Sequence, residues 1–217
     1  MSDISMQKIF ESIYFQNSWQ GEESKSGPSS GLATTKNLRE ALPQLIQKYS
    51  VRTILDAPCG DFFWMKECIY KVKDLTYIGA DIVQPMIEEL HQANEDRSNV
   101  NFLHLDIVND ELPEADMMIC RDFLFHMSYS DANKFINNFI RSGIPYLLTT
   151  SHDISHKDIV NNDIATGQWK WMDLFGVPYN FPANYIEKIS DGWGDRYLYL
   201  WEKSSLENTK ILNPEDQ

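Results

Sequence analysis

Residues 52–61 read RTILDAPCGD, a short apolar run that ends on a carboxylate and passes at once into a tight turn. An apolar run of this length, closed by Pro-Cys-Gly, is typical of a buried strand and the turn after it. We expect Asp61 to cap a helix that runs to about Val72. The stretch therefore predicts a strand-turn-helix unit.

The same unit repeats along the chain. Helices are predicted at 35–49, 84–95 and 130–141, and strands at Arg52–Ala57, Thr76–Asp81, Asn101–Asp106, Ala115–Asp122 and Pro145–Thr150. Strands that alternate with helices favour right-handed crossovers and a parallel sheet covered on both faces. Two later runs, Tyr185–Ile189 and Arg196–Trp201, flank an Asp-Gly turn signal and predict an antiparallel hairpin at one edge. The fold class is α/β: a Rossmann-like, doubly wound, mostly parallel sheet in three α/β/α layers, with a C-terminal antiparallel hairpin.

The length of 217 residues suits one domain with a single large core. Apolar residues at helical spacing predict a short helix around Ile9 and Tyr14, and a Gly/Ser-rich stretch follows it. We expect residues 1–34 to form this N-terminal helix and a lid-like loop, residues 35–203 to form the main domain, and residues 204–217 to form a flexible tail.

The charge balance excludes several classes of partner. The sequence has 19 Lys and Arg against 32 Asp and Glu, a formal net charge of −13. Such a chain lacks the basic surface that nucleic-acid or anionic membrane binding requires, so we expect a small-molecule substrate. No apolar run is long enough to span a bilayer and no leader pattern is seen, which predicts a cytoplasmic protein. The odd number of cysteines predicts reduced thiols, and the histidine spacing predicts no metal site.

Four carboxylates mark the predicted strand ends: Asp56, Asp81, Asp106 and Asp122. A single such residue is commonly a helix cap or turn former. In an open α/β sheet, however, ligands bind beyond the carboxyl ends of the strands, where these four would meet. Their shared position predicts a ligand site with a strongly acidic lining.

The first turn discriminates between cofactors. A dinucleotide site needs several glycines for close approach to a pyrophosphate, whereas Gly60 stands alone between Asp56 and Asp61, which would repel it. S-Adenosylmethionine carries an ammonium and a sulfonium and no phosphate, and therefore fits better. Asp81 follows Gly60 by 21 positions, close to the interval at which a second-strand carboxylate meets ribose hydroxyls.

Four segments together resemble the motif series of class I S-adenosylmethionine-dependent methyltransferases: ILDAPCGDFFWM, YIGADIV, FLHLDI and MMICRDFLFHMS. The segments NSWQGEESKSGPSS, LLTTSH and NNDIATGQWKWMDL further resemble a bacterial subgroup associated with surface-polysaccharide and specialised-metabolite clusters. The resemblance implies S-adenosylmethionine as cofactor, with Asp56, Gly60 and Asp61 at its methionine moiety, Asp81 at the ribose, and Asp106 with Ile107 at the adenine. The full implied cofactor set is Asp56, Ala57, Gly60, Asp61, Trp64, Asp81, Ile82, Asp106, Ile107 and Arg121.

The segments after the fourth and fifth strands carry the signals for the methyl acceptor. The Asn-Pro signature of amino-group methyltransferases is absent there, which favours an oxygen acceptor such as a sugar, a nucleotide-activated sugar or a related metabolite. His126 is the first candidate base because an imidazole can take a hydroxyl proton near neutral pH. His152 is the second, and Asp122 would orient either one.

A polar and aromatic cluster and the N-terminal loop supply candidate substrate contacts: Trp19, Asn162, Asp163 and Trp169. The alternative is a loop that its own side chains hold in place. Two alternative functions also stay open, a nicotinamide-dependent oxidoreductase of the same fold and a module that binds a cofactor without catalysis.

Overall fold

The computed structural model describes residues 5–154, 156–207 and 209. Within this part of the chain a sheet of seven strands runs in the order β3-β2-β1-β4-β5-β7-β6. The strands are β1 Thr53–Asp56, β2 Thr76–Asp81, β3 Val100–His104, β4 Met117–Cys120, β5 Tyr146–His152, β6 Glu187–Ser190 and β7 Arg196–Glu202. Strands β1 to β5 pair in parallel, and β7 pairs antiparallel with both β5 and β6. The predicted fold class is confirmed.

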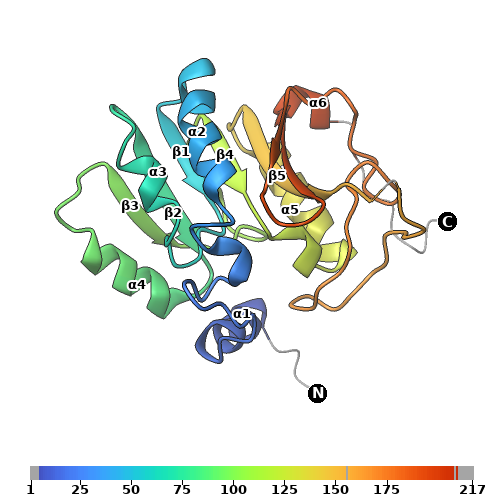
Figure 1. Cartoon of the computed structure of the whole chain (residues 1–217), viewed down its shortest axis with the longest axis horizontal. Coiled ribbons are helices and arrows are strands. Elements are labelled where there is room, and N and C mark those ends of the chain that lie inside the picture. The colour runs from blue at the N-terminus through green and yellow to red at the C-terminus, as the bar shows by residue number, and fades with distance from the viewer. Residues whose placement is uncertain (1–4, 155, 208, 210–217) are drawn as a thin grey trace.

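Helices cover both faces of this sheet (Figure 1). The described helices are α1 Met6–Phe15, α2 Lys36–Lys48, α3 Lys66–Ile69, α4 Gln84–Ala93, α5 Tyr129–Arg141 and α6 Lys203–Leu206, with 3-10 turns η1 Pro28–Ser30 and η2 Leu124–His126. Side chains of α2 and α3 pack into one core cluster, and those of α5 pack into the other. Neighbouring residues of β1 join opposite clusters, Ile54 with α2 and Leu55 with α5, because successive side chains of a strand point to opposite faces.

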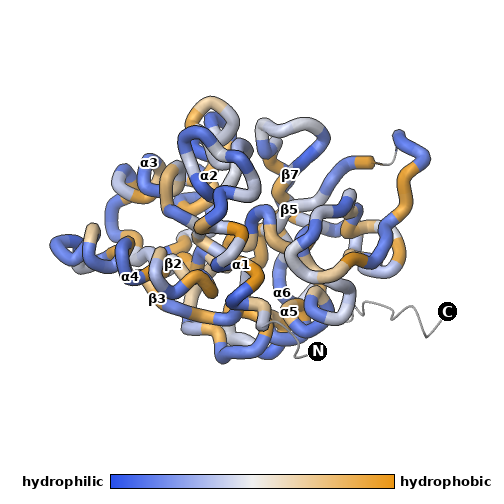
Figure 2. Tube along the Cα trace, turned by 90° about the horizontal axis from the view of Figure 1, so that it is seen from below, coloured by the Kyte–Doolittle hydropathy of each residue, from blue (hydrophilic) through white to orange (hydrophobic). Residues whose placement is uncertain are grey.

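The ligand position follows from the strand order. Strand β1 has β2 on one side and β4 on the other, so the direction in which the sheet is built reverses between β1 and β4. Crevices at such a reversal are the usual ligand sites of open α/β sheets. Helix α1 lies across this end of the sheet and, seen from below, over the middle of the molecule (Figure 2).

The helix predicted from Asp61 to Val72 is wrong in its extent. The chain turns through residues 60–65, and α3 covers only Lys66–Ile69. Phe62 has a φ of 58°, a left-handed conformation that an α-helix cannot contain. The Phe62 ring is buried against Tyr77 and Phe102. Because this packing holds Phe62 in its left-handed conformation, the helix begins only at Lys66.

Between β5 and β6 the described residues form neither helix nor strand, and this long segment runs along one side of the molecule (Figure 1). At the other end of the hairpin, the expected tail does not begin at residue 204, because α6 occupies Lys203–Leu206 and Leu206 is fully buried. Residues 208 and 210–217 of the expected tail lie outside the described residues.

Candidate active site

A cavity with an empty volume of about 830 Å³, counted out to open solvent, lies at the carboxyl ends of β1, β2 and β4. One side, the strand-end wall, consists of residues that follow β1 and β2: Asp56, Pro58, Cys59, Gly60, Asp81, Ile82 and Val83. The other side, the strap wall, combines residues after β4 with residues of the loop 17–35, which we call the strap: Trp19, Ser26, Ser30, Arg121, Asp122, Phe123 and His126.

Asp56 closes β1 inside the cavity and is only 4% exposed. Its Oδ2 accepts a hydrogen bond of 2.6 Å from the hydroxyl of Tyr77. Burial raises the pKa of Asp56 to about 7, against the lowering effects of Tyr77 and the Arg121 charge. A buried carboxylate with so little compensation favours a cationic ligand group.

Asp81 closes β2 and holds the first turn in place. Its Oδ2 accepts from the amide of Gly60 at 3.0 Å, and its Oδ1 accepts from the amide of Val83 at 3.0 Å. Burial raises the pKa of Asp81, while these backbone hydrogen bonds act to lower it. The Ile82 amide also acts on this carboxylate, whose oxygens can together accept about four hydrogen bonds, so capacity is left for a ligand hydroxyl.

A second cavity of about 260 Å³ of empty volume adjoins the first, since Phe10, Pro58, Asp81, Ile82 and Phe123 line both. It extends past β3 to Met6, Leu105, Asp106 and Ile107. Its lining is mostly apolar, and the Asp106 carboxylate already accepts from the amide of Val108 and the side chain of Asn109. This arrangement suits a flat, largely apolar group with polar edges.

Asp61 lines the cavity, but its carboxylate is used mainly by the strap. Ser24 Oγ donates to it at 2.9 Å, the amide of Lys25 at 2.9 Å and Ser26 Oγ at 3.3 Å. A methionine moiety bound at Asp61, as the sequence predicts, would therefore have to compete with these hydrogen bonds for the carboxylate. Ala57, also expected at the cofactor, is fully buried outside the cavity lining, and its amide continues the pairing with β4. Trp64 lines the cavity, with the Arg121 guanidinium 5.5 Å from its ring centroid.

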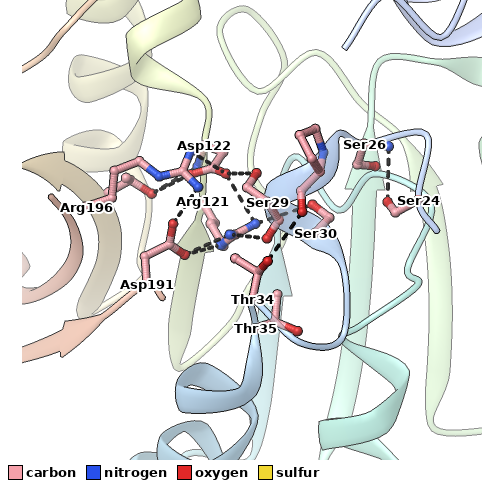
Figure 3. A network of polar contacts seen from close by, with 12 residues as sticks. Ser24, Ser26, Ser29, Ser30, Thr34, Thr35, Arg121, Asp122, Asp191 and Arg196 are labelled. Atoms are coloured by element: carbon pink, nitrogen blue, oxygen red, sulfur yellow. Dashed lines mark hydrogen bonds and ion pairs between the residues drawn. The ribbon is translucent and has the colours of Figure 1, made fainter. Parts of the chain in front are cut away.

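Within and behind the strap wall, four largely buried charges alternate in a ring (Figure 3). Arg121 and Arg196 each contact Asp191 at 2.7 Å, and they contact Asp122 at 3.3 Å and 3.1 Å. Arg121 also donates to the carbonyl oxygen of Ser29 at 2.9 Å, and Ser29 Oγ donates to Asp122 at 2.9 Å. Burial acts to raise the pKa of Asp122, but Arg121, Arg196 and the Ser29 hydroxyl hold it below its usual value. These charges neutralise one another and anchor the strap.

His126 lies in the strap wall with its tautomer fixed. Its Nδ1 is 2.8 Å from the carbonyl oxygen of Gln168, which can only accept, so Nδ1 carries the proton and Nε2 keeps its lone pair in the neutral ring. Burial lowers the pKa of His126, against the raising effects of Gln168 and Asp122, and the ring is therefore neutral at pH 7. The Trp19 ring lies over it, with centroids 5.2 Å apart.

Several other expected site residues lie away from both cavities. His152 is 2% exposed, packs against Phe125, Trp169 and Trp171, and has a pKa lowered to about 4 by burial. The His152 imidazole lines neither cavity, whereas that of His126 lines the first. Trp169 is 50% exposed and lines neither cavity.

Asn162 and Asp163 also line neither cavity. The Asp163 carboxylate accepts from the amides of Tyr129 and Ile164, and the Asn162 side chain donates to the carbonyl oxygen of Asp163. These residues hold their own loop against α5, which is the alternative expected for this cluster. Of the four predicted substrate contacts, only Trp19 reaches the cavity.

Sequence reasoning missed part of the lining and all of its support. Phe10 and Tyr14 of α1 line the cavity, although their helical spacing gave a signal only for an amphipathic helix. Asp191 was interpreted as a turn former and Arg196 as the start of a strand, yet both are buried ion-pair partners. Their contacts with Arg121 and Asp122 connect segments 70 or more positions apart, which no local pattern contains.

Three further findings concern the cysteines, metal-binding geometry and membrane-spanning helices of the described residues. Cys59, Cys68 and Cys120 are free and buried. Across residues 5–154, 156–207 and 209, no three or more His, Cys, Asp or Glu residues gather in a geometry for a metal ion. In the same ranges no helix combines the length and apolarity needed to cross a membrane.

Comparison with known proteins adds a family match and a fold match. Residues 54–143 match a family described as a methyltransferase domain. No curated protein matches the sequence. NodS, an N-methyltransferase from Bradyrhizobium japonicum WM9 solved with S-adenosyl-L-homocysteine, is 14% identical with a TM-score of 0.59, and the alignment covers 92% of this chain and 98% of that chain.

Two further structures have the same fold. Human N-acetylserotonin methyltransferase in complex with SAM is 13% identical with a TM-score of 0.57, over 97% of this chain and 61% of that one. The 16S rRNA methylase RmtB is 14% identical with a TM-score of 0.53, over 82% of this chain and 63% of that one. The alignments with two more structures, PigF with SAH and the mitomycin 7-O-methyltransferase MmcR, cover 54% and 52% of those chains, so this chain spans about half their length. The chain thus has the Rossmann-like fold of these methyltransferase structures, and residues 54–143 of it are similar to the methyltransferase domain family.

Proposed function

We propose that this protein is an S-adenosylmethionine-dependent methyltransferase that methylates an oxygen atom of a small hydroxylated acceptor. The observation that carries the proposal is the composition of the cavity. It joins two buried carboxylates at strand ends, Asp56 and Asp81, to a neutral histidine, His126, on the opposite wall.

The residues present fit the cofactor. Asp56, buried and with a pKa raised to about 7, would hold the ammonium group, which supplies the missing counter-charge. The remaining capacity of the Asp81 carboxylate would accept from a ribose hydroxyl. The adjoining cavity, with Ile82 and Ile107 in its lining, would take the adenine.

Bound S-adenosylmethionine would supply an activated methyl group on a sulfonium. The chain contributes positioning and removal of one proton. His126 Nε2 would accept the proton of the acceptor hydroxyl. The negative charge of Asp122, which acts to raise the pKa of His126, would help to stabilise the developing imidazolium, while the Arg196 charge acts against it. Trp19, whose ring lies over His126, would cover this end of the cavity and limit access of water.

The acceptor class rests on charge and on the resemblance to a bacterial subgroup. The net charge of −13 argues against a nucleic-acid acceptor, although one structure of this fold is an rRNA methylase. The similar structures include an N-methyltransferase, so the fold does not define the acceptor atom. Resemblance to the polysaccharide-associated subgroup supports a sugar, a nucleotide-activated sugar or a related metabolite.

Calorimetric titration with S-adenosylmethionine, S-adenosylhomocysteine and NAD tests the cofactor. We expect saturable binding of the first two and none of the third, whose diphosphate would meet Asp56 and Asp61. Incubation with labelled S-adenosylmethionine and a panel of hydroxylated metabolites, with amine analogues as controls, tests the acceptor. Preferential methylation of the amines would overturn the oxygen assignment.

A further inference from the structure

The strap is held to the protein at two places of very different character. Its first part, residues 17–27, contacts the cavity through Trp19 and Ser26. Its second part, residues 28–35, contains η1 and leads into α2. We propose that the strap opens at one end only: residues 17–27 swing away when Asp61 releases them, while residues 28–35 stay in place.

The first part depends on one carboxylate. Asp61 accepts from Ser24 Oγ, from the amide of Lys25 and from Ser26 Oγ, and Lys25 is exposed. Ser24 is 3% exposed, but Asp61 and Ser26 line the open cavity, so water can take over these hydrogen bonds when residues 17–27 move away. The first part is joined to the second by an exposed hydrogen bond from the amide of Leu32 to Glu23, and by one from the amide of Ser30 to the carbonyl oxygen of Gly27 at the junction itself. Movement of residues 17–27 away from the cavity therefore breaks few hydrogen bonds.

The second part is anchored in the buried ring of charges (Figure 3). Ser29 contacts both Arg121 and Asp122. The Arg121 side chain is 5% exposed and that of Asp191 is 0% exposed. Opening at this end would take the Ser29 carbonyl oxygen from Arg121 and the Ser29 hydroxyl from Asp122 while both charges stay in the ring, which costs more than the loss of hydrogen bonds that water can replace.

Both parts pack closely on the protein, the first through a side chain and the second through its backbone. A Cβ added at Gly60 would lie 2.2 Å from Ser26 Oγ, at the end of a side chain that can rotate away. A Cβ added at Gly192 would lie 2.1 Å from the carbonyl oxygen of Thr34, so the second part lies directly against the β6–β7 turn. Between the two parts stands Gly27, with a φ of 102° that other residues rarely adopt. A glycine at this place can absorb a change of backbone direction, and it marks the hinge.

Asp61 is by this inference a positioning residue, which holds Trp19 and Ser26 in the cavity wall by way of the strap. A role as direct cofactor ligand differs from this in one respect. Only the positioning role predicts that the ligand-free strap becomes more mobile when Asp61 is changed.

Hydrogen exchange of the full chain, with and without S-adenosylhomocysteine, tests the division. In the ligand-free protein, peptides from residues 17–27 are expected to exchange about tenfold or more faster than those from 28–35, and ligand should slow only the former. Equal exchange of the two parts, or faster exchange of 28–35, would overturn the inference. This comparison holds even if S-adenosylhomocysteine does not bind, an outcome that would instead reject the proposed cofactor.

Variants separate the positioning role from a ligand role. Asp61→Asn and Ser24→Ala should both speed the ligand-free exchange of residues 17–27. Both should also raise the dissociation rate of S-adenosylhomocysteine by about tenfold, followed by the fluorescence of Trp19 and Trp64. Ser24→Ala leaves the Asp61 carboxylate in the cavity, so an effect of Asp61→Asn alone would mean a direct ligand and contradict the proposal.

Asp116→Asn is the matched control. Asp116 accepts from the amides of Arg52 and Thr53 at the opposite end of β1, and it does not touch the strap. It should leave both the exchange of residues 17–27 and the dissociation rate unchanged. A response of the strap to Asp116→Asn equal to that of Asp61→Asn would show general destabilisation and would also contradict the proposal.

Discussion

The strand-end wall of the cavity is built from residues close together in the chain, whereas the strap wall is assembled from distant segments. Asp81 and Gly60, which meet in the first wall, are 21 positions apart. In the second wall Arg121 reaches Ser29 across 92 positions and Asp191 across 70. One wall is a consequence of strand-turn units, and the other exists only in the folded protein.

This difference suggests a division of labour. The strand-end wall offers carboxylates for cations and hydroxyls, which are features of the proposed cofactor. The strap wall offers His126 beside charges that are already neutralised, which suits proton transfer from an acceptor. Changes in the first wall should therefore weaken cofactor binding, and changes in the second should slow the reaction.

The largest expected effect would separate the two walls most sharply. His126→Ala should lower the rate of methyl transfer by about 10²-fold to 10⁴-fold, the usual contribution of a general base, and leave cofactor affinity nearly unchanged. Single-turnover rates and calorimetry measure the two quantities. His91→Ala, on the exposed side of α4, is the control. If His126→Ala also weakened cofactor binding, the two walls would not have separate roles in binding and catalysis.

A second test addresses the strand-end wall. Asp81→Ala should weaken S-adenosylmethionine binding by about 10-fold to 100-fold, because each hydrogen bond to a charged group contributes about 1.5–3 kcal/mol. Asp106→Ala should cost less, since that carboxylate already has partners within its own turn. Calorimetry on the folded variants compares them. An unchanged affinity for Asp81→Ala would remove the ribose assignment.

The pH dependence of binding should be a property of the strand-end wall alone. Because the pKa of Asp56 is raised to about 7, the ligand-free carboxyl is mostly protonated below that pH. An ammonium needs the ionised form, so binding should release a proton, and affinity should fall by up to about tenfold per pH unit below pH 7. Calorimetry in buffers of different ionisation enthalpy measures the proton release.

Asp56→Asn provides the control for this dependence. It should bind the cofactor weakly at all pH values and release no proton. The catalytic rate at saturating cofactor should depend on His126 instead. Because the pKa of His126 is lowered, this rate should stay level from pH 7 to 8 and decline only when the pH falls below the pKa of His126. Proton release that persists in Asp56→Asn would assign the dependence to another group.

The smallest expected effect concerns the aromatic cluster outside the cavities. Trp169→Ala should change the rate and the apparent acceptor affinity by less than about twofold, because Trp169 lines neither cavity. Trp19→Ala should raise the apparent KM for the acceptor several-fold, because Trp19 lies over His126. Steady-state kinetics with one active acceptor compares them. A larger loss for Trp169→Ala would restore its predicted role in substrate binding.

Local sequence patterns predicted the secondary structure well where burial alone decides it. The β2 strand was predicted with its observed bounds, Thr76–Asp81, because a run buried on both faces has a clear apolar signal. The helix after Asp61 was predicted too long, because the left-handed Phe62 owes its conformation to packing against Tyr77 and Phe102. The aromatic and polar residues at 161–171 indicated a binding cluster, but composition does not tell which way a loop faces.

The sequence by itself determined the repeated strand-turn-helix units and the carboxylates Asp56 and Asp81 at the strand ends, because short-range periodicity and parallel pairing place such residues at one edge. Only the tertiary structure decided that the strap covers this edge, that His126 and not His152 lies in the cavity, and that Asp191 and Arg196 support it. Those choices depend on buried ion pairs and packing between remote segments. The energies of these ion pairs and packing contacts arise only when folding brings the segments together and excludes water.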